Sequence, residues 1–319
     1  MEAADRAEGS LEVGPGAWEL NPLGFPPPVM NYTYVHSLER GWDNMPSTRF
    51  FQTYNWKLSL SLSAAYLAFI YFGGRWMKTN GPDLSLRPLL LTWNIGLAIF
   101  SFLGAFRMLP ELIHVLRHFG FQPSMKEVIQ EVTAFWTEMF AWSKIVELGD
   151  TVFLVLRKRP VIFLHWYHHI TVMMYTWHAC KDHTAAGRWF VTMNYAIHSI
   201  MYAYYAFMAL GFRRLPKLIP ILITSSQLAQ MLVGCYIAFR VHTAKSRGEL
   251  CQQSYENLYL CLAMYATYAL LFANYFLQAY VFNSKTLSKM RKTKANGELN
   301  GCAANGGKNG HLNGHAKCD

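Results

Sequence analysis

The sequence has 319 residues, a formal net charge of +10, 52% hydrophobic residues and only 15% charged residues. A soluble chain usually carries about 25% charged residues, so the composition argues against a water-soluble fold and favours a membrane protein. The basic residues lie mainly in short loops beside apolar runs. Membrane topology explains that placement, and we expect no nucleic-acid partner.

The N-terminal residues 1–50 are rich in Gly, Pro and polar side chains, and we expect a loosely ordered luminal segment there. This segment contains the sequon Asn31-Tyr32-Thr33, which is a glycosylation site if it faces the lumen. Residues 51–284 follow as a seven-span domain. Each span needs about 20 apolar residues to cross a hydrocarbon core of ~30 Å. The expected transmembrane helices cover about residues 55–75, 88–109, 132–156, 162–180, 188–210, 218–240 and 257–282.

The loops alternate in charge, and this sets the orientation of the chain. The more basic loops lie around residues 75–87, 157–159, 213–217 and 285–294, and the denser side is expected to be cytosolic. With seven spans, the N-terminus is then luminal and the C-terminus cytosolic. We interpret residues 285–319 as a basic stretch followed by a disordered Gly/Asn-rich tail, because that tail lacks apolar residues for a core.

Three histidines in the fourth expected span carry the strongest chemical signal. His165, His168 and His169 stand at helix positions i, i+3 and i+4, so their imidazoles share one face inside the membrane. Imidazole acts as a base, a nucleophile or a metal ligand. Polar groups at this depth usually face a cavity or a partner. A hydrogen-bonded structural cluster is the alternative.

Three further polar strips lie on neighbouring spans. The fifth span places Asn194, His198, Tyr202 and Tyr205 on one face; simple packing is the alternative for the tyrosines. The third carries the motif Lys144-x-x-Glu147-x-x-Asp150-Thr151, for which a structural ion-pair network is the alternative. The sixth carries Thr224-x-x-Gln227-x-x-Gln230, for which interhelical hydrogen bonding is the alternative. Four polar faces on four consecutive spans predict one shared buried site.

These four motifs, in this order, resemble those of the fatty acid elongase (ELO) family over roughly residues 50–294. The run from Phe163 to Val172 is similar to the branch that elongates saturated and monounsaturated long chains, such as palmitoyl-CoA. The resemblance implies an all-α protein of the endoplasmic reticulum membrane. Its seven transmembrane helices would include an inverted barrel of spans two to seven around an acyl tunnel.

The resemblance also implies a reaction, the condensation of acyl-CoA with malonyl-CoA to give 3-oxoacyl-CoA, CO2 and CoA. The middle histidine of the box, His168, would carry the acyl group as an acyl-imidazole. His165 and His169 would orient it, and His198 and Asn194 would polarise the carbonyl or orient malonyl-CoA. We expect the basic groups to attract CoA phosphates and the other motif residues to bind substrate: Lys144, Arg157, Lys158, Glu147, Asp150, Tyr202, Tyr205, Gln227 and Gln230.

No tightly bound cofactor and no metal site are expected. The expected partners are the two CoA substrates and membrane lipid, and family analogy adds a homodimer and the other enzymes of the elongation cycle. The chain departs from the family after the cluster Lys289–Lys294, where residues 295–319 follow, which conflicts with retrieval by a terminal dilysine.

Two other classes of protein remain open from the sequence. A membrane di-iron desaturase or hydroxylase also uses histidine boxes, but it needs about eight imidazole ligands. A seven-span transporter or receptor would explain the topology without explaining four stacked polar motifs.

Overall fold

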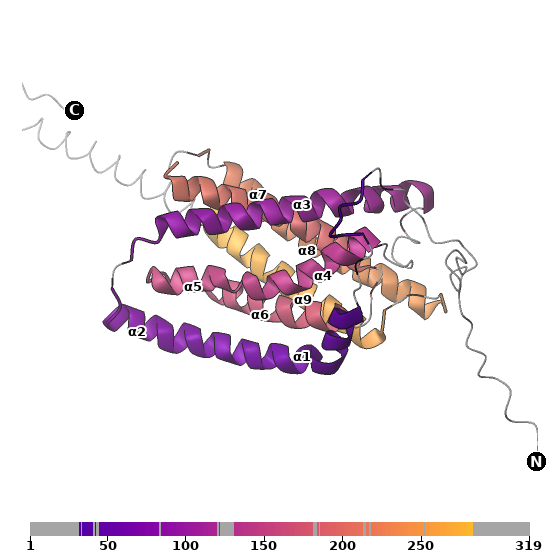
Figure 1. The fold of residues 1–319 in the computed structure, drawn as a ribbon, viewed down its shortest axis with the longest axis horizontal. Coiled ribbons are helices and arrows are strands. Elements are labelled where there is room, and N and C mark those ends of the chain that lie inside the picture. The colour runs from indigo at the N-terminus through magenta and orange to yellow at the C-terminus, as the bar shows by residue number, and fades with distance from the viewer. Residues whose placement is uncertain are drawn as a thin grey trace, which may run out of the picture. The chain divides into compact units, whose positions relative to one another are not determined.

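The computed structural model describes residues 32, 34–40, 42, 45–82, 84–119, 121, 131–180, 184, 186–212, 215–216, 218–249, 251 and 253–282. Within this part of the chain all regular structure is helical, as expected (Figure 1). The elements, in order, are α1 (Met45–Ala68), the π-helical η1 (Phe69–Gly73), α2 (Gly74–Thr79), α3 (Arg87–Phe119), α4 (Glu131–Val146), α5 (Gly149–Leu156), α6 (Phe163–Cys180), α7 (Gly187–Leu210), α8 (Leu218–Ser246), α9 (Tyr255–Phe276) and the π-helical η3 (Leu277–Phe282).

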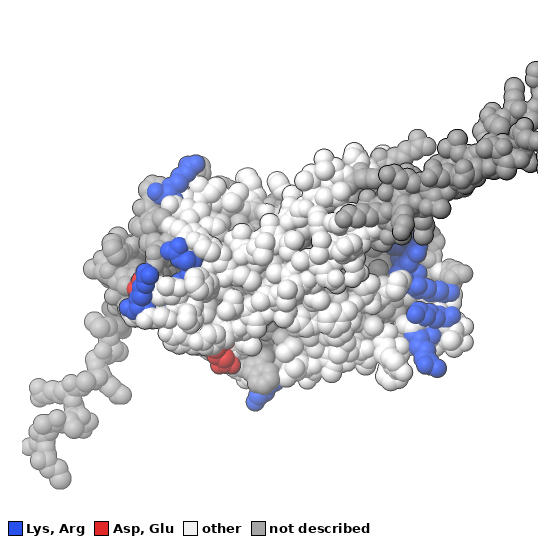
Figure 2. All heavy atoms as spheres, turned by 180° about the vertical axis from the view of Figure 1, so that it is seen from behind, with Lys and Arg blue, Asp and Glu red and all other residues white. Residues whose placement is uncertain are grey.

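Every expected span coincides with helical structure, although several boundaries differ from the prediction. Among the described residues, three helical stretches are long and apolar enough to cross a membrane by themselves: Arg87–Arg117, Leu218–Ser246 and Tyr255–Phe282. The helices α4, α6 and α7 carry the polar motifs, which lower their mean hydropathy. On one face of the molecule, Lys and Arg side chains gather at two opposite ends, with a wide, mostly uncharged band between them (Figure 2).

Helix α3 extends ten residues beyond the expected end at residue 109, and it passes through Pro110. A proline inside a helix removes one backbone hydrogen bond, so the helix continues here at a local cost. The added turns are anchored by polar contacts. Within them, Glu111 is buried and faces the guanidinium of Arg188 on α7 at 3.4 Å.

The third expected span is broken into α4 and α5 around Glu147 and Leu148. At the break, backbone hydrogen bonds change from i−4 to i−3: Leu148 donates to Ile145 O, and Thr151 donates to Leu148 O, both at 3.1 Å. This tighter winding, typical of 3₁₀ turns, changes the direction in which the following side chains point. After the break, Thr151 therefore faces α1 and α6, and Asp150 reaches α3 as well as α7.

The N-terminal boundary also differs from the prediction, because α1 begins at Met45 and the segment before it is partly packed. The carboxylate of Glu39 accepts hydrogen bonds of 2.8 Å from Arg107 Nε and from Trp136 Nε1. Burial raises the pKa of this carboxyl, but the hydrogen bonds from Arg107 and Trp136 outweigh it and hold the pKa below its ordinary value. Loose order up to residue 50 is therefore wrong for these residues. Residues 1–31, with the sequon at Asn31, and the tail 283–319 lie outside the described residues.

The chain divides into two units, Met1–Ala269 and Leu270–Asp319. In the first unit, α7 contacts α3, α4 and α8, and α6 contacts α1 and α4. One core cluster joins α1, α4 and α6 through Phe51, Ala141, Met173 and Trp177. The described part of the second unit consists of the end of α9 and η3.

Candidate active site

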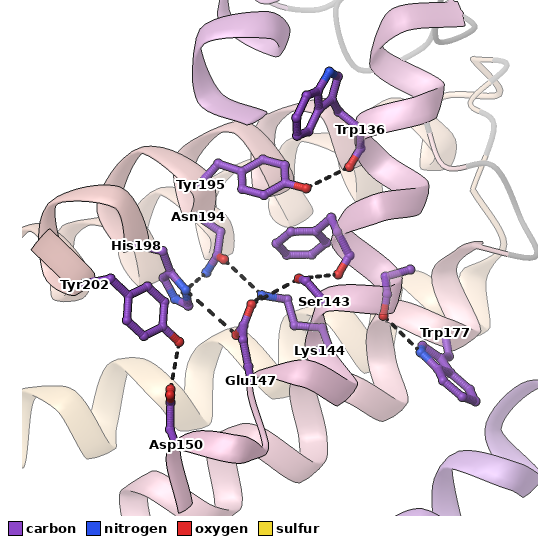
Figure 3. A network of polar contacts seen from close by, with 12 residues as sticks. Trp136, Ser143, Lys144, Glu147, Asp150, Trp177, Asn194, Tyr195, His198 and Tyr202 are labelled. Carbon is purple, nitrogen blue, oxygen red and sulfur yellow. Dashed lines mark hydrogen bonds and ion pairs between the residues drawn. The ribbon is translucent and has the colours of Figure 1, made fainter. Parts of the chain in front are cut away.

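A buried ion pair lies at the centre of the polar network between α4 and α7 (Figure 3). The Lys144 ammonium donates to Oε1 of Glu147 at 2.6 Å, and the Lys144 side chain is only 1% exposed. It also donates to Oδ1 of Asn194 at 3.3 Å and lies 3.9 Å from the centroid of the Phe140 ring. The structure thus shows the ion pair that the sequence offered as the alternative reading of this motif. Such depth requires that both charges be compensated, because burying a lone charge is costly.

The orientation of the Asn194 amide follows from the chemistry of its neighbours. Lysine is a donor only, so the Asn194 atom that faces Lys144 must be the oxygen. The amide nitrogen then faces Nε2 of His198, at 3.2 Å. Because an amide nitrogen can only donate, Nε2 of His198 is the acceptor. A neutral His198 therefore carries its proton on Nδ1.

That Nδ1 atom of His198 faces the second oxygen of the Glu147 carboxylate. The two atoms are 3.8 Å apart, too far for a hydrogen bond, and both are buried without a hydrogen-bond partner. A shift of less than an ångström would close the contact. His198 thus lies between an amide donor and a carboxylate acceptor. This arrangement fixes its tautomer.

The carboxylate of Asp150 is held by donors from two other helices. Trp93 on α3 donates through Nε1 to Oδ1, and Tyr202 on α7 donates through its hydroxyl to Oδ2, both at 2.7 Å. Gly149 permits this approach, because a Cβ atom at that position would lie 2.5 Å from the Trp93 ring. The break between α4 and α5 therefore joins α3, α5 and α7 at one carboxylate. Thr151, the next residue, lies 2.8 Å from Nε2 of His165 on α6.

The three histidines of α6 do lie together. The ring centroids of His165 and His169 are 4.4 Å apart, and those of His168 and His169 are 5.6 Å apart. His169 is buried, whereas His165 and His168 are partly exposed. The His168 ring lies 4.9 Å from that of Tyr268 on α9, whose hydroxyl donates to the His168 carbonyl at 3.2 Å.

The histidine cluster and the α4–α7 network form a single site. They are linked through the break between α4 and α5, where Thr151 contacts His165 and its neighbour Asp150 is bound by Tyr202 of α7. The expectation that the polar faces of α4, α6 and α7 meet is thus consistent with the geometry. Within the described residues, no group of three or more His, Cys, Asp or Glu side chains is arranged to hold a metal ion.

The strip on α8 lies beside this network and contacts its neighbours. Gln227 donates through Nε2 to the sulfur of Met201 on α7 at 3.3 Å. Gln230 is buried and hydrogen-bonds with Tyr265 on α9. Thr224 donates to the carbonyl of Pro220 within its own helix. The structure therefore shows the two glutamines in interhelical contacts.

Tyr205 and Lys144 were both expected to bind substrate, and the structure shows the surroundings of each. Tyr205 is 45% exposed and lies outside the buried network. Lys144 is committed to Glu147 and Asn194, so its ammonium is not available to a CoA phosphate at the surface. By contrast, Arg157, directly after α5, is exposed, and Lys158 is partly exposed.

Four residues that contact the site were missed from the sequence: Trp93, Tyr66, Tyr268 and Ser143. Trp93 binds Asp150, Tyr66 reaches Thr151, Tyr268 binds the His168 backbone, and Ser143 donates to Glu147 at 3.1 Å. None of the first three belongs to one of the four polar motifs. Ser143 is adjacent to Lys144 and four residues before Glu147, a spacing that places it on the same helix face as that carboxylate.

Comparisons with known proteins agree with this picture. The model of the family described as "ELO: GNS1/SUR4 family" matches residues 51–288. The putative fatty acid elongase 3 of Caenorhabditis elegans is 48% identical over 268 residues, which cover 83% of each chain. The very long chain fatty acid elongase 6 of Drosophila melanogaster is 45% identical over 79% of this chain and 80% of its own. The human protein of the same name is 42% identical over 75% of this chain and 88% of its own.

Proposed function

The chain belongs to the ELO (GNS1/SUR4) family, and from this membership we infer that it is a fatty acid elongase, the 3-oxoacyl-CoA synthase that carries out the condensing step of chain elongation. The observation that carries this conclusion is the family match over residues 51–288, which includes all four polar motifs. The relatives are named as fatty acid elongases, and this chain aligns with most of the length of each.

The substrates in this proposal are a long-chain acyl-CoA and malonyl-CoA. The imidazole of His168 attacks the acyl carbonyl and the C–S bond breaks. The imidazole N–H proton passes to the leaving thiolate, which gives a neutral acyl-imidazole and free CoA. Malonyl-CoA then loses CO2, and the resulting carbanion attacks the acyl carbon. This step forms the new C–C bond, breaks the acyl–nitrogen bond and gives 3-oxoacyl-CoA, and the released imidazole takes up a proton from solvent. Splitting the reaction into two steps lowers each barrier, and a dry site protects the acyl-imidazole from water.

The positions of the other histidines support His168 as the carrier. Nε2 of His165 contacts Thr151, and His198 is held between Asn194 and Glu147. His169 is buried beneath the rings of its two neighbours on α6. His198 is the proposed group that polarises the substrate carbonyl or orients malonyl-CoA, with its Nδ1 atom facing Glu147. Asn194 positions His198 in this account and does not itself bind malonyl-CoA.

The membrane arrangement proposed for this enzyme has seven spans, with an acyl tunnel inside an inverted barrel of spans two to seven. Support comes from the correspondence of all seven expected spans with helices and from the mostly uncharged band in Figure 2. The end of α2, whose last turn holds Lys78, the start of α3 at Arg87 and the end of α5, followed by Arg157, lie at the same end in Figure 1. We assign that end to the cytosol, with a luminal N-terminus carrying a glycan at Asn31, in the endoplasmic reticulum membrane.

CoA recognition is assigned to the exposed cations after α5. Phosphate groups of CoA would bind Arg157 and Lys158 at the cytosolic end. The double variant Arg157→Gln/Lys158→Gln should raise the KM of both CoA substrates, most strongly at low salt. Arg247→Gln, an exposed cation after α8, is the matched control. Equal KM values in the double variant and the control would refute the role of Arg157 and Lys158 in binding CoA.

The proposed acyl substrates are saturated and monounsaturated long chains such as palmitoyl-CoA. The basis is the run from Phe163 to Val172 and the similarity to proteins named very long chain fatty acid elongase 6. A homodimer and association with the enzymes that reduce and dehydrate the product are further proposals from family analogy.

The test of the proposed function is extension of an acyl chain by the purified full-length protein. Palmitoyl-CoA and radiolabelled malonyl-CoA should give a labelled 3-oxoacyl-CoA two carbons longer, with release of CO2. Folded protein that extends no acyl-CoA would refute the proposal. Stoichiometric iron required for turnover would instead support an oxidative enzyme.

A further inference from the structure

A hydrogen-bonded chain connects the first helix to the histidine cluster. The hydroxyl of Tyr66 on α1 lies 2.6 Å from Oγ1 of Thr151, and the same oxygen lies 2.8 Å from Nε2 of His165. We propose that Tyr66 is a positioning residue that fixes the tautomer and the ring orientation of His165 through Thr151. This inference rests on the proposed condensing function, for which it adds a residue outside the four polar motifs.

The contact between Tyr66 and Thr151 lies in the buried core. Thr151 is 0% exposed and Tyr66 is 6% exposed. The helix α1 packs on α6, which carries the histidines, and the tightly wound break before α5 directs Thr151 toward both. The proposed six-helix barrel leaves the first span outside. Tyr66 would make that span part of the catalytic unit.

The direction of the hydrogen bonds can be derived from donor and acceptor counts. The Thr151 hydroxyl has one proton, so it donates either to His165 or to Tyr66. If it donated to Tyr66, the Tyr66 proton would need another acceptor, and the described residues offer none. A buried hydroxyl without a partner is costly. The satisfied arrangement has Tyr66 donating to Thr151 and Thr151 donating to Nε2 of His165, which places the proton of neutral His165 on Nδ1.

This tautomer matters because His165 is in ring contact with its neighbour. The His165 and His169 centroids are 4.4 Å apart, and His169 in turn contacts His168. With Nε2 engaged by Thr151, the Nδ1–H of His165 is the group left to donate within the site. Without the Tyr66 hydroxyl, the Thr151 hydroxyl can rotate so that its proton no longer points at Nε2 of His165. His165 then samples both tautomers and a wider range of orientations.

The kinetic test compares two substitutions that remove the same atom. Tyr66→Phe should lower kcat by about tenfold with little change in the KM of acyl-CoA, because misorientation affects the chemical step more than binding. Tyr71→Phe, at an exposed tyrosine in η1, is the matched control and should leave kcat unchanged. Thr151→Val should lower kcat at least as much, and Thr151→Ser, which keeps the hydroxyl, should retain most of it.

A double-mutant cycle separates positioning from a general packing effect. If Tyr66 acts through Thr151, the double variant Tyr66→Phe/Thr151→Val should be no slower than Thr151→Val alone. Full additivity of the two effects would overturn the proposal, as would a Tyr66→Phe variant as active as Tyr71→Phe.

A spectroscopic readout keeps this inference distinct from the proposed function. In protein with ¹⁵N-labelled histidine, the His165 signals, assigned by their loss in His165→Gln, should show a protonated Nδ1 and an unprotonated Nε2. Tyr66→Phe should shift both signals toward a mixture of tautomers. Unchanged signals would overturn the positioning role even in an active enzyme. Shifted signals in a protein that does not condense would support the positioning role and refute only the condensing function.

Discussion

Replacing Lys144 by methionine tests the physical basis of the site, because it removes one charge from a buried network and keeps the length of the side chain. In the native structure the ammonium compensates the Glu147 carboxylate at 2.6 Å and donates to Asn194 at 3.3 Å. After Lys144→Met, the carboxylate is buried without this cation, and the Asn194 amide oxygen loses the ammonium as a donor. Removing one partner of a buried pair typically costs about 3–5 kcal/mol.

That magnitude gives a measurable change in thermal stability. For a large domain, 1 kcal/mol corresponds to about 2 °C in Tm, so Lys144→Met should lower the Tm of the detergent-solubilised protein by roughly 6–10 °C. The matched control is Lys78→Met, at an exposed lysine in the last turn of α2, where the change in unfolding free energy should stay within about 0.5 kcal/mol.

A second substitution distinguishes lost charge compensation from lost packing. Glu147→Gln added to Lys144→Met removes the uncompensated carboxylate, and it should recover at least half of the lost Tm. It should not restore activity, because the double variant regains neither the Lys144 ammonium nor the Glu147 carboxylate. The reasoning is refuted if Lys144→Met is no less stable than Lys78→Met, or if the added Glu147→Gln lowers the Tm further.

Two further predictions concern helix packing and the N-terminal segment. Gly104→Ala should destabilise the protein by about 1–3 kcal/mol, because its new Cβ would lie 2.6 Å from the Tyr195 ring; Gly96→Ala on the same helix meets nothing within 4 Å and should be neutral or stabilising. Equal effects of the two alanines on Tm would contradict the close contact of α3 with α7. The lowered pKa of Glu39 predicts that its contact with Arg107 stabilises the fold above the unfolded pKa of about 4.3 and that this contribution is lost as the pH falls through the folded value. The Tm difference between wild type and Glu39→Gln should therefore be largest near neutral pH and shrink below about pH 4; a difference that is constant with pH would contradict the assignment.

The residues that could be predicted from the sequence are those whose spacing places them on one helix face. The contact between Lys144 and Glu147 follows from an i, i+3 step, and the grouping of His165 with His169 follows from an i, i+4 step. Such steps are fixed by the geometry of a single helix and need no knowledge of its neighbours.

The contacts between helices were not accessible in this way. Spacing does not reveal that Trp93 donates to Asp150 or that Tyr66 reaches Thr151, because both depend on how α1, α3 and α5 are placed beside one another. The break after Val146 was also missed, since Glu147, Leu148 and Gly149 continue a helical pattern in the sequence. The break is what turns Thr151 toward α1 and α6, whereas Lys144 and Asp150 both contact α7.

The expected end of α3 at residue 109 shows a different limit. Proline is a common helix breaker, yet Pro110 lies inside the helix, where the following turn is held by Glu111 and its contact with Arg188. Tertiary contacts of buried polar groups here outweigh a local preference. The same explanation applies to residues 34–40, whose composition suggests loose order but whose Glu39 is bound by two side chains from α3 and α4.

The central claim is that an imidazole inside this helical domain carries the acyl group, and mass spectrometry of the trapped intermediate tests it most directly. Wild-type protein incubated with palmitoyl-CoA without malonyl-CoA should gain the mass of one acyl chain, located on His168 after proteolysis, and should lose it when malonyl-CoA is added. His168→Ala should remain folded, gain no acyl group and make no product. An acyl group found on another residue, or substantial condensation by folded His168→Ala, would contradict the account.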